Sequence, residues 1–422
     1  MRTSGMIKSH VRCSARSGRP TRSAFAPRTF WMIVMACLLC TDVALSQIYR
    51  LPNPAERAGD FFGVSVDIEG HRAAVGASGA DSCGADSGAT YIYESDSTTG
   101  HWNHVATLVP NDCTPGDFFG RSLDMSGDRI VVAAFRPAHL ANRPNAAYLF
   151  ERDSLTGAWI QRARFTEVPE REEGAYAAAV AIDGDNVLVT SSGDAINEQY
   201  HGTGYLYRPS PNARGTWRLT QRIVPATSAS LGVFGSSAVI RNDVMVVGAS
   251  TYLAARPGSV YFLGLDESTG RWKFQRRFGG LDDFFLPLDV NGNRAIVGER
   301  RAGSDESGRA TLFERDAEGA WIRSGVLYPA RDFEYGAFGS NVALGDNRAL
   351  VVGFDEQLRF EFNIDRVVYV FENTGPSVWR QRHIVDVGDV AFGSDLAVDG
   401  SLALIGQAAD SQPGAAYIVQ LH

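Results

Sequence analysis

The sequence predicts an all-β fold: a seven-bladed β-propeller with four antiparallel strands per blade, closed into a ring by the N-terminal strand. Three observations support this prediction. A stretch that reads Phe-Gly, alternating residues, tight turn and apolar run occurs seven times. Each repeat divides into four short segments of β type, without a helical period. The last repeat lacks its fourth segment, and the residues before the first repeat match that segment.

The repeat is clearest at residues 60–77, Asp-Phe-Phe-Gly-Val-Ser-Val-Asp-Ile-Glu-Gly-His-Arg-Ala-Ala-Val-Gly-Ala. The glycine of the Phe-Gly pair, or the residue aligned with it, recurs at intervals of 57, 57, 58, 51, 53 and 54 residues. Its seven positions are Gly63, Gly120, Ala177, Gly235, Leu286, Gly339 and Gly393. Four short strands in a repeat of this length are typical of a β-propeller. The repeats of other propeller families measure roughly 40–50 residues.

The four segments of a repeat differ in pattern. The first alternates: in residues 64–68 the apolar side chains share one face, while Ser65 and Asp67 share the other. A two-residue turn then closes a hairpin. The second segment is apolar throughout, which fits a strand covered on both faces by neighbouring blades. The third is aromatic, as in residues 91–93, and the fourth begins with a tryptophan, Trp102 in the first repeat.

The other blades follow in the same order. Their third segments are predicted at 146–151, 204–207, 259–262, 310–314, 368–372 and 415–419, and the fourth begins at Trp159, Trp217, Trp272, Trp321 and Trp379 in blades two to six. In blade seven the chain stops before a fourth segment. Residues 47–54 align with residues 104–111, so we expect them to supply the outer strand of blade seven. This closure would hide two open sheet edges.

The first 46 residues read as a signal peptide. Seven basic residues and no acid precede an uncharged apolar run at 30–40, and the small residues Ala44 and Ser46 follow it. The run is shorter than the ~20 residues that span a bilayer, which disfavours the alternative of an uncleaved membrane anchor. We expect cleavage after Ser46, a secreted or extracytoplasmic protein, and one propeller domain at 47–422 with no transmembrane segment.

Removal of the leader makes the chain more acidic. It takes away seven bases and one acid, which leaves 33 bases, 47 acids and a net charge of −14. This balance argues against nucleic acid and anionic membrane surfaces as partners. Only Cys83 and Cys113 remain as cysteines, and both fall in connections that emerge on the same face of a propeller. We therefore expect a Cys83–Cys113 disulfide. We also expect the protein to be a monomer.

Phe-Gly-x-Ser-Val, followed by Val-Gly-Ala and Gly-Ala-x-Tyr, resembles the FG-GAP repeat of integrin α-chain propellers and their exported bacterial relatives. The resemblance covers residues 47–422. It implies a non-catalytic binding or cell-adhesion module that meets a protein or glycan on the face carrying the strand two-to-three and four-to-one connections. These include residues 78–87, 136–144, 192–203, 251–257, 300–307 and 355–365. The calcium loop of integrin repeats has no counterpart here, because the strand one-to-two turns lack its oxygen spacing.

A ring of acids is the candidate binding feature. Asp60, Asp117, Glu173, Asp283 and Asp389 each stand three or four residues before the Phe-Gly position. Gathered around one mouth of the channel, they could hold Ca²⁺ or attract a cationic ligand. The alternative is that each carboxylate caps its own turn by accepting a backbone N–H. No other cofactor is expected.

The alternative function is that of a propeller enzyme, a glycosidase or lyase acting on polysaccharide. Such enzymes need converging carboxylates, arginines, histidines or tyrosines on the inner strands. The inner segments here are mostly Ser, Ala, Val and Leu, and the histidines are scattered without metal-ligand spacing. The sequence therefore favours a binding module over an enzyme.

Overall fold

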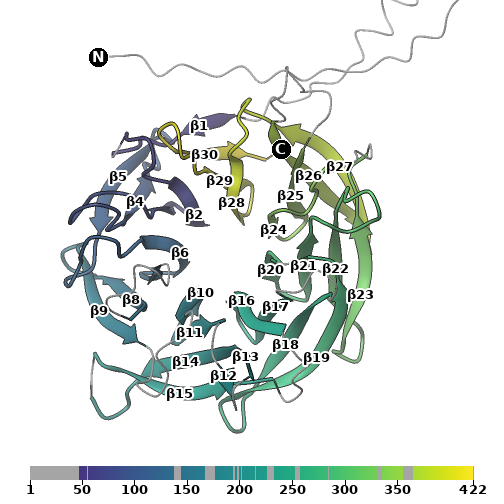
Figure 1. Ribbon diagram of the computed structural model, residues 1–422, viewed down its shortest axis with the longest axis horizontal. Helices are drawn as coiled ribbons and strands as arrows, with labels where there is room; N and C mark the ends of the chain where they lie inside the picture. The colour runs from purple at the N-terminus through teal and green to yellow at the C-terminus, as the bar shows by residue number, and fades with distance from the viewer. Residues whose placement is uncertain are drawn as a thin grey trace, which may run out of the picture.

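A computed structural model describes residues 47–54, 56–136, 144–166, 176–192, 195–196, 199–200, 202–213, 215–225, 232–251, 257–283, 285–330, 335–354 and 365–421. These residues form seven four-stranded antiparallel sheets, arranged as blades around a central channel (Figure 1). The predicted all-β, seven-bladed propeller is confirmed. The predicted signal peptide at 1–46 lies outside the described residues and stays a prediction.

Blades one to six use their strands in chain order from the channel to the rim, and blade seven takes its outermost strand from the N-terminus. Blades one to three are β2 (Phe62–Glu69), β3 (Arg72–Ala77), β4 (Ala89–Ser95) and β5 (Trp102–Leu108); β6 (Phe119–Ser126), β7 (Arg129–Ala134), β8 (Ala146–Arg152) and β9 (Trp159–Thr166); and β10 (Tyr176–Asp183), β11 (Asn186–Ser191), β14 (Thr203–Pro209) and β15 (Trp217–Ile223). A small hairpin of β12 (Ala195–Ile196) and β13 (Gln199–Tyr200) interrupts blade three.

The remaining blades keep this order. Blades four to six are β16 (Gly232–Arg241), β17 (Val244–Thr251), β18 (Gly258–Asp266) and β19 (Arg271–Leu281); β20 (Leu288–Asn291), β21 (Arg294–Glu299), β22 (Arg309–Arg315) and β23 (Trp321–Leu327); and β24 (Val342–Leu344), β25 (Arg348–Phe354), β26 (Arg366–Gly375) and β27 (Val378–Val385). Blade seven is β28 (Phe392–Asp399), β29 (Leu402–Gln407), β30 (Ala415–Gln420) and β1 (Ile48–Arg50).

The ring closes as the sequence predicts. Strand β1 pairs antiparallel with β30, with Tyr49 opposite Ile418, so the first and last strands share a sheet (Figure 1). Leu51 continues the pairing by donating its N–H to the carbonyl of Ala416 at 2.8 Å, and its side chain is 1% exposed. The hydroxyl of Tyr93 in blade one donates to the carbonyl of Pro52 at 2.6 Å. The N-terminal segment therefore joins blade seven to blade one.

The core lies between blades. Each apolar cluster combines side chains of two neighbouring blades, and the cluster that closes the ring contains Phe62 and Val75 of blade one with Leu404 and Ile418 of blade seven. This arrangement explains the apolar second segments, because both faces of those strands are covered. Blade-to-blade packing is thus the main stabilising contact of the fold.

The Phe-Gly pair has two separate packing roles. The buried Phe62 ring lies against Tyr91 on the third strand of its own blade, with 5.7 Å between centroids. Gly63 has a φ of +91°, and a Cβ there would lie 2.3 Å from the carbonyl oxygen of Ala415 in blade seven. Glycine is required because the backbones of adjacent blades touch at this point.

Blade five departs from the aligned motif. Phe285 is 50% exposed, whereas Leu286 is fully buried in the core between blades four and five. Thr311 stands where the third strand of most blades carries the tyrosine, and its hydroxyl donates to the buried carboxylate of Glu299. The aromatic pair of the other blades is replaced here by Leu286 and a Glu299–Thr311 contact.

An arginine at the start of the second strand ties several blades to the next one. Arg72 donates to the carbonyl of Gly127 at 2.8 Å, and its guanidinium lies 5.4 Å from the centre of the Trp159 ring in blade two. Arg129 makes the same contact with Trp217 at 5.6 Å. The predicted tryptophans are therefore packed between blades, where cation–π contacts add to burial.

Candidate functional site

The propeller presents two different faces. The strand two-to-three and four-to-one connections emerge on one, here called the loop face, and the tight hairpins between strands one and two emerge on the other, called the turn face. The predicted acids Asp60, Asp117, Asp283 and Asp389 lie on the loop face, in the connections that lead into β2, β6, β20 and β28. Glu173 lies outside the described residues.

The buried carboxylates of Asp60 and Asp117 cap their own turns. Asp60 accepts the backbone N–H of Arg57 at 3.2 Å, and Asp117 accepts that of Thr114 at 2.7 Å. Asp117 also forms an ion pair with the buried guanidinium of Arg136. Burial raises the pKa of Asp60, and its bond from Arg57 opposes that rise. These contacts are those of the turn-capping alternative.

The other two described acids are also engaged locally. Asp283 accepts the N–H of Arg300 at 2.8 Å, and Asp389 accepts that of Ala391 at 2.7 Å. Each carboxylate lies in the connection of its own blade, and the described residues contain no group of three His, Cys, Asp or Glu side chains placed to hold a metal ion. The structure thus spreads the acids around the loop face without joining them into one coordination site.

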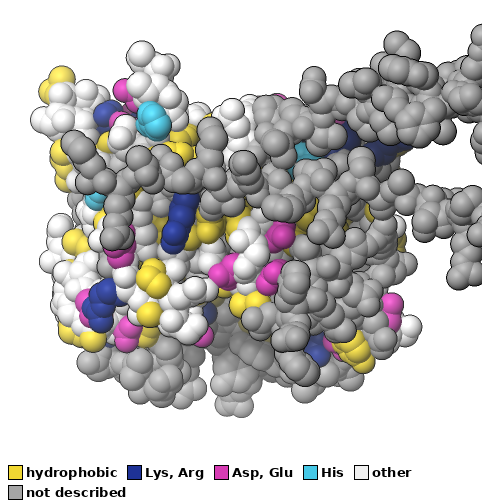
Figure 2. Space-filling view, turned by 90° about the horizontal axis from the view of Figure 1, so that it is seen from above, with side chains coloured by type: hydrophobic (Ala, Val, Ile, Leu, Met, Phe, Trp, Pro, Cys, Tyr) yellow, Lys and Arg dark blue, Asp and Glu magenta, His cyan; other side chains and the backbone are white. Residues whose placement is uncertain are grey.

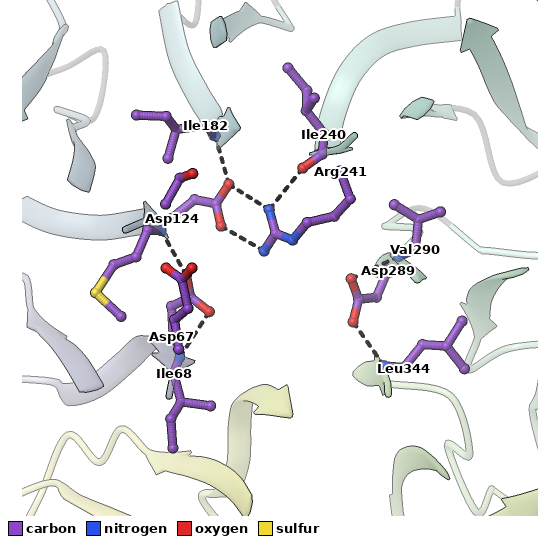
Figure 3. A network of polar contacts seen from close by, with 12 residues as sticks. Asp67, Ile68, Asp124, Ile182, Ile240, Arg241, Asp289, Val290 and Leu344 are labelled. Carbon is purple, nitrogen blue, oxygen red and sulfur yellow. Dashed lines mark hydrogen bonds and ion pairs between the residues drawn. The ribbon is translucent and has the colours of Figure 1, made fainter. Parts of the chain in front are cut away.

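A second set of carboxylates points into the central channel. Asp67, Asp124, Asp289 and Asp395 come from the inner strands of blades one, two, five and seven, and they line a cavity of about 770 Å³. Figure 3 shows three of them, with Arg241 of β16 pointing to Asp124. The channel is therefore a polar interior space with charged groups of both signs.

These carboxylates join consecutive blades. Asp67 accepts the N–H of Met125 at 2.7 Å, and Asp124 accepts that of Ile182 at 2.6 Å (Figure 3). In each case the donor lies on the inner strand of the next blade. Such bonds satisfy backbone groups that the inner edge of each sheet would otherwise leave open.

Two more hydrogen bonds from a backbone N–H to a carboxylate of the preceding blade lie on the other side of the ring. Asp289 of blade five accepts the N–H of Leu344 in blade six at 2.8 Å. Asp395 of blade seven lies two residues earlier in its strand, at the position of Ser65, and accepts the N–H of Val66 in blade one at 2.8 Å. Each donor again belongs to the following blade.

Arg241 crosses the channel. Its guanidinium donates to both carboxylate oxygens of Asp124, at 2.9 and 3.1 Å, and to the carbonyl of Ile240 at 2.8 Å. The two side chains come from blades four and two, so the ion pair spans blade three. The negative charge of Asp124 raises the pKa of Arg241 above its ordinary value. In blades three and four, Ala181 and Val239 stand at the position that aligns with Asp67. In this part of the ring Arg241 supplies a polar contact instead.

Burial controls the acidity of the channel. It raises the pKa of Asp289 and of Asp395 to about 6, and it raises that of Asp67 well above the ordinary value, with the charge of Asp124 adding to the effect. A perturbed carboxylate in a cavity is a candidate for acid–base chemistry. Here, however, each of these three groups holds a backbone N–H, so a structural role accounts for its burial.

The channel carboxylates follow a signal that the sequence does contain. Asp67 and Asp124 occupy the same place in consecutive repeats, 57 residues apart, on the polar side of the alternating first strand. The apolar side of that strand packs against the preceding blade, so the polar side faces the inner strand of the next blade, where Asp67 accepts the N–H of Met125. The candidate site predicted from the sequence, in contrast, lies in the turns that precede this strand.

The disulfide prediction is confirmed. Cys83 lies in the strand two-to-three connection of blade one, and Cys113 in the connection to blade two, with 6.1 Å between their Cα atoms. The bridge fastens two loop-face connections to each other. Within the described ranges there is no helix with the length and apolarity to cross a membrane.

A family model described as FG-GAP repeat matches residues 50–93 and 102–150, which span strands β2 to β8 of blades one and two. The search of curated proteins returns no match. These findings place the recognised repeat at the start of the ring, and the strand order repeats it through the other blades.

Three of the solved structures with a similar fold are named as lactonases. A Bacteroides fragilis protein named as a 6-phosphogluconolactonase is 12% identical at a TM-score of 0.50, over 77% of this chain and 84% of its own. A Bacteroides uniformis protein of the same name is 11% identical at 0.51, over 78% and 86%. The periplasmic gluconolactonase of Pseudomonas aeruginosa is 16% identical at 0.48, over 75% and 85%. Identities this low indicate a shared fold alone.

Proposed function

This chain is an FG-GAP repeat β-propeller protein, and from that premise we propose that it is an exported, non-catalytic binding module whose ligand is a protein or glycan met on the loop face. The observation that carries the proposal is the contrast between the two faces. The loop face holds connections of unequal length, among them residues 78–88 and 300–308, whereas the described turn-face hairpins between strands one and two are short and uniform. Variable loops on a rigid scaffold are the usual place for recognition.

On the turn face, the hairpins of neighbouring blades are hydrogen-bonded to each other. Glu69 accepts the N–H of Gly127 at 2.6 Å, and Asp399 accepts that of Gly70 at the same distance. Each bond joins the hairpin of one blade to the hairpin of a neighbour. Polar groups that are used in this way contribute to closure of the ring and leave the loop face as the more available surface for a ligand.

The outer wall is a weaker candidate surface. In the side view of Figure 2 the described charged side chains of both signs are interspersed with apolar ones and do not gather into one patch. Outer strands that carry charged residues are typical of sheet edges protected against pairing with another chain. This supports the loop face as the binding surface and a monomeric module.

The rival proposal is a propeller enzyme acting on polysaccharide or on a sugar lactone. It would draw on the channel, where buried carboxylates line a cavity of about 770 Å³. Asp67, Asp124, Asp289 and Asp395 each hold a backbone N–H of the next blade, so using one as an acid or base would break a blade contact. That geometry favours the binding module.

A paired assay separates the two proposals. Residues 47–422 are applied to a glycan array and to a set of extracellular-matrix and surface proteins, and the same preparation is assayed for release of reducing sugar from polysaccharides and for hydrolysis of gluconolactone. We expect saturable binding without turnover. Turnover that disappears in Asp124→Asn would contradict the proposal and transfer the function to the channel. Matched Asp128→Asn, on the exposed turn-face hairpin, is the control variant.

A further inference from the structure

A largely buried arginine on the loop face has no acidic partner among the described residues. Arg366 is the first residue of β26, and its guanidinium donates one hydrogen bond, to the hydroxyl of Ser340 at 3.1 Å. Buried cations in proteins are normally paired with a carboxylate or bound to an anion. A cation held by one neutral hydroxyl therefore has unused donors.

The neighbouring arginines already have carboxylate partners. Arg300 lies 3.4 Å from the buried carboxylate of Asp283, and Arg301 lies 3.5 Å from Glu306. Arg300 is also close enough to Arg366 for the two positive charges to repel. Burial, with this repulsion added, lowers the pKa of Arg366 to about 10. The protein as it stands disfavours the charge that an arginine must carry.

A small cavity opens next to this arginine, between blades five and six. It measures about 360 Å³ and is lined by Arg300, Arg301, Glu306, Tyr335 and Ala337. The N–H of Ser340, the residue that holds Arg366, donates to the carbonyl of Ala337 in the cavity wall at 3.1 Å. Arg300 and Arg301 thus line one opening on the loop face, and Arg366 holds Ser340 next to its wall.

The wall of the cavity is held in an unfavourable backbone conformation. Glu306, Tyr335 and Ala337 have φ values of +51°, +60° and +46°, and none of them is glycine. The N–H of Tyr335 donates to the carbonyl of Asp305 at 2.9 Å, which ties the loop entering blade six to the loop of blade five. Strain of this kind is retained where surrounding structure enforces it, often at ligand sites.

We propose that this cavity binds the oxyanion group of an acidic saccharide, with Arg366 and Arg300 donating to the carboxylate, sulfate or phosphate and the Tyr335 ring packing against the sugar. The assignment rests on the proposed function, whose ligand class it narrows. An oxyanion would supply the missing counter-charge, and guanidinium groups match its geometry with paired donors. Tyr335 is 64% exposed, so its ring is open to a ligand. A volume of about 360 Å³ falls at the small end of ligand pockets.

The test is calorimetric titration of residues 47–422 with four sugars at constant ionic strength: glucuronate, galactose 6-sulfate, glucose 6-phosphate and neutral glucose. At least one acidic sugar should bind. Comparing the affinities of the three acidic sugars shows whether the site prefers a carboxylate, a sulfate or a phosphate. Arg366→Met keeps the apolar stem and removes the donors, and it should weaken that binding about 10- to 100-fold. Arg348→Met, at the start of β25 on the turn face, should leave the affinity unchanged.

A structural role for the arginine gives a different result. If Arg366 only stabilised the fold, Arg366→Met would lower the melting temperature of the free protein and leave sugar affinity as it was, which would overturn the proposal. If Arg366→Met does not fold, an experiment on the wild-type protein still tests the proposal. Crystals soaked in selenate should show anomalous density within hydrogen-bond distance of Arg366, and density confined to other sites would overturn the assignment.

The outcome also separates this inference from the proposed function. Binding of only neutral glycans or acidic peptides, equal in wild type and Arg366→Met, would overturn the acidic-saccharide site and leave the binding module intact. Arg366-dependent binding of an acidic sugar together with its cleavage would support the site and overturn the non-catalytic function.

Discussion

Removal of the closing strand should destabilise the propeller far more than trimming a chain end normally does. The change is a protein that begins at Pro54 in place of Gln47. It removes β1, whose residues pair with β30, and Leu51, whose side chain is 1% exposed. It also removes the carbonyl of Pro52, which accepts the buried hydroxyl of Tyr93.

The size of the effect follows from these contacts. Loss of a buried leucine costs about 2–5 kcal/mol, and an unsatisfied buried hydroxyl costs about 1–3 kcal/mol. The sum of roughly 3–8 kcal/mol is a large share of the 5–15 kcal/mol that stabilises a typical domain. At roughly 2 °C for each kcal/mol in a protein of this size, the melting temperature should fall by roughly 6–16 °C.

Circular dichroism during heating measures this fall, and urea unfolding gives the corresponding free energy. Leu51→Ala alone should account for roughly two thirds of the loss. Leu155→Ala is the matched control, because that side chain is 94% exposed on a hairpin and should change the melting temperature by less than about 1 °C. Equal melting temperatures for the shortened and full proteins would refute the closure of the ring by residues 47–54.

Three further predictions concern the channel and the loop face. Burial raises the pKa of Asp289 and Asp395 to about 6 from 3.8, so the folded protein binds protons more tightly between about pH 4 and 6. Their stabilisation is fully present below pH 3.8 and is lost as pH rises through about 6. Urea titrations should therefore show that replacing both with asparagine removes about 2–3 kcal/mol of this pH dependence per group; an unchanged profile would contradict it. Arg241→Met should cost about 1–3 kcal/mol by removing the charged hydrogen bonds to Asp124, and a double-mutant cycle with Asp124→Asn should show less than additive loss. Reduction of the disulfide, which closes a separation of 30 residues, should lower the free energy of unfolding by about 2–4 kcal/mol, whereas alkylation without reductant should label no thiol.

The fold could be predicted from the sequence because seven repeats carry the same packing information. Gly63 is needed where backbones of adjacent blades touch, and its return at a fixed interval reports the blade contact itself. Residues 47–54 were assigned to blade seven for a similar reason, since they repeat a segment that blade seven lacks. The disulfide followed from the two connections that hold its cysteines.

The site could be predicted only in part. Asp60 stands at a turn on the loop face, as expected, but its carboxylate is used by the N–H of Arg57, a contact that no repeat pattern specifies. The ion pair of Arg241 with Asp124 joins blades two and four, 117 residues apart, at a single place in the ring. Arg366 was missed because its lack of a counter-charge is a property of its surroundings. Features that occur once, across the ring, leave no periodic signal in a single sequence.

The most direct test of the account is a crystal structure of residues 47–422 with the best-bound ligand of the array. The account predicts an intact ligand on the loop face, in contact with the connections of blades five and six and within hydrogen-bond distance of Arg366. A ligand seated in the central channel against Asp67 and Asp124, or a cleaved ligand at that place, would contradict it.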